Sequence, residues 1–246
     1  MSEQQFATPH PVRLEVKIAA GNIDVSTAQD GQSTIALSGP EKLVAATSVE
    51  LVGDRLLIQQ RRKSLIGWFG RLEESLNVSA RIPQRSSVEI VTASGEARLD
   101  GSFGGLEVKS ASGHVVVSGE LDGDAQVKTV SGAVRLPRLA GDLTVKSVSG
   151  DVAADSVGGS VIVKSVSGDV RVGSLHKGKV EVQSVSGDVE LGVASGTSIA
   201  VDASSASGNL TSEVPLSDGS GGEREASLRI HGNTVSGDLR VFRAAA

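Results

Sequence analysis

Apolar and polar residues alternate in short segments through the last two thirds of the chain. Val170 and Val172 flank Arg171, and Val180 and Val182 repeat the pattern a few residues later. A period of two places such valines on one face of a strand and the charged residues on the other. The corresponding apolar pairs elsewhere are Val152 and Ala154, Val161 and Val163, Val189 and Leu191, and Ile199 and Val201. The pattern predicts many short strands, each buried on one face.

A serine-glycine pair punctuates these strands at a nearly constant spacing. The successive glycine spacings are 18, 19, 18, 18, 19, 21 and 29 residues. A steady period indicates a solenoid in which each repeat stacks on the last. The glycines are Gly95, Gly113, Gly132, Gly150, Gly168, Gly187, Gly208 and Gly237.

A second glycine series, half a coil away, gives each coil two corners. It consists of Gly105, Gly123, Gly141, Gly159, Gly178 and Gly196. An apolar residue lies two positions before most of them and three before Gly178 and Gly196: Phe103, Leu121, Leu139, Val157, Leu175 and Val193. Glycine at a corner is expected to adopt backbone angles that a Cβ would resist.

The repeat differs from three known solenoid patterns. Steps of six from Val157 reach Val163 and then Asp169, so the apolar period of hexapeptide helices fails. The GGxGxD signature of calcium-binding rolls and the Thr-x-Thr columns of ice-binding solenoids are both missing. We therefore predict an all-β fold: a single-stranded parallel β-solenoid with coils of about 18–19 residues. The pattern does not decide its handedness, and a right-handed coil is our expectation.

Residues 1–86 lack the repeat and read as short strands separated by turns. A solenoid exposes a strand edge at each end, and such an edge invites pairing with another chain. We expect an N-terminal β cap region at 1–86, ending near Pro83, and solenoid repeats at 87–246. A Ser/Gly-rich loop insertion near 216–225 accounts for the spacing of 29, and Phe242 is a candidate lid at the other end.

Composition restricts the function more than it defines it. Of 246 residues, 39% are apolar but only 2% aromatic, which suits a thin aliphatic core. The net charge of -5 gives no basic footprint for nucleic acid. With no cysteine, disulfides and cysteine chemistry are excluded. No run approaches ~18 apolar residues, so we expect a cytoplasmic protein, with peripheral membrane contact as the variant.

The repeat also resembles a known family. The Val-Lys-Ser-Val-Ser-Gly-Asp-Val unit at 145–152 is accompanied by Phe6-Ala7-Thr8-Pro9 and Asn22-Ile23-Asp24-Val25 near the start. These features resemble the bacterial β-strand-repeat family labelled "putative adhesin", over nearly the whole chain. The resemblance implies a β-solenoid and supplies no catalytic residues.

Candidate metal and catalytic residues are few. Asp151, Asp169 and Asp188 follow successive turn glycines, so their carboxylates could attract a cation. Alternatively they are solvated turn residues relieved by the lysines four positions before each turn: Lys109, Lys128, Lys146 and Lys164. The histidines are His10, His114, His176 and His231, at unrelated repeat positions. We expect no metal, no cofactor and no enzyme activity, because a sugar-binding aromatic platform is also missing.

One segment between Arg61 and Leu72 stands out as a possible interaction patch, because it combines the only Trp with clustered cations. It contains Arg61, Arg62, Lys63, Leu65, Ile66, Trp68, Phe69 and Arg71. It is a hairpin folded onto the solenoid, a patch for a partner or for self-association, or a weak contact with an anionic membrane surface.

These features predict a non-enzymatic β-solenoid scaffold for protein interaction or assembly. Its partner is an unknown protein or a second copy of the chain. The alternatives are a membrane-peripheral, envelope-associated component and an end-to-end polymer resembling the bactofilin type of cytoskeletal β-helix.

Overall fold

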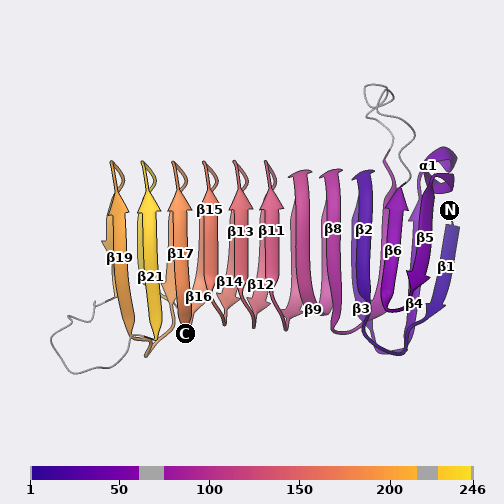
Figure 1. The fold of residues 1–246 in the computed structure, drawn as a ribbon, viewed down its shortest axis with the longest axis horizontal. Helices are drawn as coiled ribbons and strands as arrows, with labels where there is room; N and C mark the ends of the chain where they lie inside the picture. The colour runs from indigo at the N-terminus through magenta and orange to yellow at the C-terminus, as the bar shows by residue number, and fades with distance from the viewer. Residues whose placement is uncertain (1, 61–74, 215–226, 245–246) are drawn as a thin grey trace. The chain divides into compact units, whose positions relative to one another are not determined.

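The computed structural model describes residues 2–60, 75–214 and 227–244. The chain divides into two compact units, 1–122 (unit 1) and 123–246 (unit 2). Parallel strands stacked coil upon coil make up most of each unit (Figure 1). The predicted all-β solenoid is therefore confirmed. The helix α1 (Glu41–Ala45) is the only one in the described ranges.

Unit 1 is built around parallel strands that begin close to the N-terminus. Its strands are β1 (Ser2–Ala7), β2 (Arg13–Ala20), β3 (Ile23–Ala28), β4 (Gln32–Ser38), β5 (Thr47–Val52), β6 (Arg55–Gln60), β7 (Asn77–Pro83), β8 (Ser86–Ser94), β9 (Ala97–Ser112) and β10 (Val115–Leu121). On one face β2 lies between β6 and β8; on the other, β3 lies between β7 and β9. The solenoid pairing thus extends into residues 13–28, which the sequence pattern places in the cap.

Antiparallel strands cover the outer edges of the coil formed by β6 and β7. Strand β5 pairs with β6, β4 pairs with β7, and β1 pairs with β4, all antiparallel. An antiparallel neighbour occupies the backbone groups that an open parallel edge would offer to another chain. These strands form the N-terminal β cap of the fold.

Unit 2 contains the most regular coils. Its strands are β11 (Ala125–Thr129), β12 (Val134–Leu139), β13 (Leu143–Ser147), β14 (Val152–Val157), β15 (Val161–Ser165), β16 (Val170–Leu175), β17 (Gly178–Ser184), β18 (Val189–Val193), β19 (Ile199–Ser205), β20 (Leu210–Ser212), β21 (Leu228–Thr234) and β22 (Leu239–Arg243). Odd-numbered strands pair in parallel on one face, and even-numbered strands β12 to β22 pair on the other.

The core of unit 2 consists of aliphatic columns, as predicted. Val170, Val172, Leu175, Val180 and Val182 are all buried, with at most 1% of their surface exposed. In-register pairing places each on the equivalent residue of the neighbouring coil. Burial of one such side chain stabilises the fold by about 1.5–3 kcal/mol, so the repeated columns supply most of the packing energy.

The last coil in sequence is not the last coil in space. Strand β21 pairs with both β17 and β19, and β22 pairs with both β18 and β20. Figure 1 shows β21 between β17 and β19. Because β22 lies inside the stack, Phe242 is not a lid. It is half-buried against Gly192, with its ring beneath the guanidinium groups of Arg171 and Arg240. The predicted loop near 216–225 lies outside the described residues.

The serine-glycine turns are stabilised by side-chain hydrogen bonds and by the close stacking of neighbouring turns. Ser165 Oγ donates to Gly168 O at 2.9 Å and accepts from Gly168 N at 3.1 Å. A Cβ on Gly168 would lie 2.2 Å from Gly150 O in the neighbouring coil. Gly168 is not among the described glycines with positive φ. At Gly168 the expected reason for glycine is therefore wrong, because the turn requires space rather than unusual backbone angles. The expectation is confirmed at Gly95, Gly178 and Gly196, which have positive φ.

We predict that this buried serine column matters through its hydrogen bonds. Ser165→Ala removes the partner of Gly168 N and O and should lower the free energy of unfolding by about 1–3 kcal/mol. The matched control is Thr129→Val, because Thr129 Oγ1 is buried at the same position of another coil and has no partner among the described residues. Chemical denaturation should show little loss for the control; equal losses would contradict the hydrogen-bond argument.

Candidate functional site

The interaction patch expected from the sequence cannot be placed. All eight of its residues fall in 61–74, outside the residues that the structure describes. They are Arg61, Arg62, Lys63, Leu65, Ile66, Trp68, Phe69 and Arg71. The candidate surfaces below come from the described residues alone.

An exposed apolar column runs along the serine-glycine edge of unit 2. We call it the valine column; it comprises Val130, Val148, Val166, Val185 and Val235, which are 46–52% exposed. These are five of the eight large apolar side chains that are exposed among the described residues. Each occupies the turn at the arrowhead end of β11, β13, β15, β17 or β21 (Figure 1). Exposed apolar groups gathered in one strip indicate an interaction surface.

A line of lysines flanks the valine column on the odd-strand face. Lys128 is paired in register with Lys146, and Lys146 with Lys164. Stacked strands lie about 4.8 Å apart, so three like charges stand close together. Within the described residues none of the three forms an ion pair. By contrast, Lys17 and Lys109 in unit 1 each contact a carboxylate.

A line of aspartates flanks the valine column on the other face. Asp151 Oδ1 accepts from Asp169 N at 3.0 Å, and Asp169 Oδ1 accepts from Asp188 N at 2.9 Å. The series continues through Asp188 to Asp238, at 2.9 Å. Backbone N–H groups thus stabilise these carboxylates. No described lysine forms an ion pair with these carboxylates, so relief by the lysines stays a prediction.

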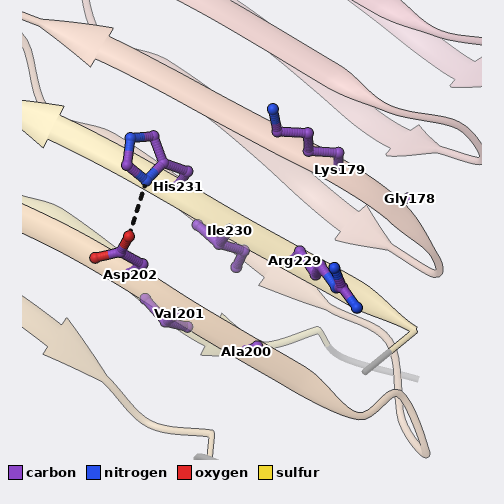
Figure 2. Close-up of a pocket in the computed structure, with 8 residues that line it drawn as sticks. All are labelled: Gly178, Lys179, Ala200, Val201, Asp202, Arg229, Ile230 and His231. Atoms are coloured by element: carbon purple, nitrogen blue, oxygen red, sulfur yellow. Dashed lines mark hydrogen bonds and ion pairs between the residues drawn. The ribbon is translucent and has the colours of Figure 1, made fainter. Parts of the chain in front are cut away.

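A shallow open pocket of about 830 Å³ lies on the outward face of β17, β21 and β19 (Figure 2). It is lined by Gly178, Lys179, Ala200, Val201, Asp202, Arg229, Ile230 and His231. His231 Nδ1 lies 3.2 Å from Asp202 Oδ2, the contact drawn dashed in Figure 2. The strand register places Lys179 beside Arg229, so one end of the pocket is cationic.

The groups around this pocket do not form a nucleophilic relay. The nearest hydroxyl of the network, on Ser204, donates to Asn233 Oδ1 at 2.7 Å rather than to the imidazole. Asn233 Nδ2 in turn lies 3.4 Å from His231 Nε2. A serine nucleophile needs its base within direct hydrogen-bond reach. No group of three or more potential metal ligands occurs in the described part of the chain.

A compensated charge network occupies the outward face of unit 1. Glu15, only 1% exposed, contacts Lys17 at 2.9 Å and Arg55 at 2.5 Å. The hydrogen bond from Lys17, followed by that from Arg55, lowers the pKa of Glu15 despite its burial. Glu89, paired with Glu15 in the strand register, has its pKa lowered by hydrogen bonds from Arg13 and Lys109. Because each carboxylate has cationic partners, this network reads as structural.

With the fold and surfaces established, the chain can be compared with known proteins. Residues 13–241 match the Toastrack DUF4097 family, and the chain belongs to this family. A "putative adhesin" from Bacteroides fragilis has a similar structure, with a TM-score of 0.59 and 12% identity over 98% of this chain and 96% of that one. A "putative lipid binding protein" from Parabacteroides distasonis gives 0.58 and 16% over 98% and 96%. Both likenesses concern the fold.

Two further findings concern curated relatives and membrane-spanning helices. The comparison with curated proteins gives no match for this chain. Among the described residues, no helix has the length and apolar character needed to cross a membrane.

Sequence reasoning missed the valine column, although the signal was present. In Val163-Lys164-Ser165-Val166 the period of two continues into the turn, which places Ser165 inside and Val166 outside. The apolar residue on the polar face was the cue. The pocket had no such cue, because the sequence does not show that β21 lies between β17 and β19.

Lowering the pH should reduce the stability of unit 1, because its ion-paired glutamates become protonated. Because the pKa values of Glu15 and Glu89 are lowered in the fold, their contribution is fully present above the ordinary carboxyl value of about 4.3. It is lost as pH falls through the lowered values. Glu15→Gln should cost about 1–3 kcal/mol at neutral pH and reduce the acid dependence, measured by denaturation from pH 7 to 3. Glu50→Gln is the control, because Glu50 is exposed and forms no ion pair with any described residue; an equal effect there would contradict this assignment.

Calcium should not stabilise the aspartate line. Its carboxylates already accept backbone N–H groups, and no described cluster has metal-binding geometry. Melting temperatures measured with excess calcium and with chelator should agree. A rise of many degrees with calcium would show that the folded state binds the ion and would refute this prediction.

Proposed function

We propose that this chain is a non-enzymatic β-solenoid scaffold that binds protein through its regular outer surface. The observation that carries the proposal is the valine column, an exposed apolar strip repeated once per coil over five coils. Soluble proteins rarely expose contiguous apolar residues without an interaction partner. A repeated strip offers many identical weak contacts along one line.

The structural neighbours support interaction in general. One of them carries the name "putative adhesin", and adhesion is a protein-binding or surface-binding role. The pocket supports binding more than catalysis, because His231 has a carboxylate partner while the hydroxyl of Ser204 binds Asn233 instead of the imidazole. That the chain lacks enzyme activity and is cytoplasmic remains part of the proposal.

A second candidate is peripheral contact with an anionic lipid surface. The valine column favours it, together with Lys128, Lys146 and Lys164, which form no ion pair with any residue that the structure describes, since apolar groups with flanking cations bind such surfaces. The name "putative lipid binding protein" of one neighbour is consistent with it. End-to-end polymerisation is less favoured, because β1, β4 and β5 lie antiparallel along the coil at the N-terminal end of unit 1.

The test is affinity capture with a surface variant. The full chain and its Val148→Ser/Val166→Ser variant are immobilised and exposed to extract of the source organism, and retained proteins are quantified by mass spectrometry. We expect at least one protein to be retained by the native chain and depleted about ten-fold by the variant. If both chains retain the same proteins in equal amounts, the valine column does not carry the function.

A further inference from the structure

We propose that the valine column is the contact surface for a second copy of this chain, which aligns edge to edge with the first along unit 2. This inference rests on the proposed interaction function and names its partner. It is argued from the spacing of the column, from the charges on its two flanks, and from the symmetry that these charges require.

The spacing of the valine column selects a partner with the same repeat. The five valines occupy five neighbouring coils, each separated from the next by the strand spacing of about 4.8 Å. A partner that contacts every valine equivalently must repeat at that spacing. A second copy does so automatically, whereas a lipid surface has no such repeat. The two valine columns can therefore contact each other, coil by coil, over their whole length.

The two flanks of the column are oppositely charged, and no ion pair with another described residue neutralises either of them. Lys146 and Lys164 lie on the odd-strand face, while Asp151 and Asp169 begin the even-strand face. No ion pair joins any of the four to another described residue. A uniformly anionic surface would attract the lysines but repel the aspartates. A partner with both charges in the opposite order satisfies both flanks.

Symmetry decides how the copies meet. A two-fold axis parallel to the direction of coil stacking brings the lysine flank of one copy opposite the aspartate flank of the other. Within the same coil level, Lys146 then faces the second copy's Asp151, and Lys164 faces its Asp169. A two-fold axis perpendicular to the stacking direction would instead oppose like charges. The parallel arrangement is the one that we infer.

The association should be weak and salt-sensitive. A standard stable interface buries about 800 Å² per partner, more than one strip of half-exposed valines supplies. Exposed ion pairs add little and are screened by salt. A dissociation constant above about 1 µM is therefore expected, so that the dimer forms only at high local concentration.

Sedimentation-velocity ultracentrifugation of the full chain over a concentration series tests this proposal. The native chain should shift from monomer to dimer as concentration rises. Val148→Ser/Val166→Ser should raise the dissociation constant at least about ten-fold. Ile162→Ser is the matched control, because Ile162 is an exposed aliphatic residue of β15 that lies off the turn edge; it should leave dimerisation unchanged. Lys146→Glu/Lys164→Glu, with the valines intact, should also weaken the dimer and reverse its salt dependence, because the new glutamates face aspartates and salt screens their repulsion.

The other outcomes overturn the proposal. A native chain that stays monomeric at every concentration refutes it, as does a dimer unaffected by both the valine and the lysine variants. Flotation with vesicles of phosphatidylcholine and phosphatidylglycerol provides a separate arm: valine-dependent vesicle binding by a monomer would identify a lipid surface instead. A monomer that still retains a different protein in the capture experiment would refute the dimer alone and leave the proposed function standing.

Discussion

The direct stacking of one turn glycine on another is the constraint on which the coils of unit 2 depend. A Cβ on Gly187 would lie 2.2 Å from Gly168 O, and one on Gly168 equally close to Gly150 O. No side chain can occupy that space, so neighbouring turns approach as closely as two backbones allow. The contact holds each coil in register with the next, and in three successive turns the buried hydroxyl of Ser147, Ser165 or Ser184 binds both polar groups of the turn glycine.

Because the strands pair in register, the residues at one repeat position form a column along the stack. Inside, this pairing stacks valine on valine, and these side chains are buried from β14 to β18. Outside, it also stacks like charges, which normally repel. The aspartates escape this cost because each carboxylate accepts a backbone N–H from the neighbouring coil. In the described parts of the chain the lysines have no such partner, and this contrast makes their flank a candidate for recognition rather than for stability.

The two units share an arrangement in which one coil is inserted out of sequence order. In each, one coil lies between two others that are nearer to each other in sequence: β2 and β3 in unit 1, and β21 and β22 in unit 2. A terminal segment held on both sides by parallel strands gains twice the backbone hydrogen bonds of an edge strand. It therefore resists fraying, which is the usual weakness of a repeat stack.

The sequence by itself determined the local features of this protein. The period of two predicted which side chains face inward, Val170 and Val180 among them, because successive residues of a strand point to opposite faces. The glycine spacing predicted coils, although the physical reason at Gly168 is close approach rather than backbone angle.

Only the tertiary structure decided which coils are neighbours. The spacing of 29 residues before Gly237 is compatible with a loop between consecutive coils, yet β21 inserts beside β17 and brings His231 next to Asp202. Likewise, Lys164 and Asp169 are five residues apart in sequence but belong to opposite faces, because the chain reverses direction at the turn between them. The residue spacing predicts neither the neighbours of β21 nor the faces on which Lys164 and Asp169 lie, since both depend on pairing between segments distant in sequence.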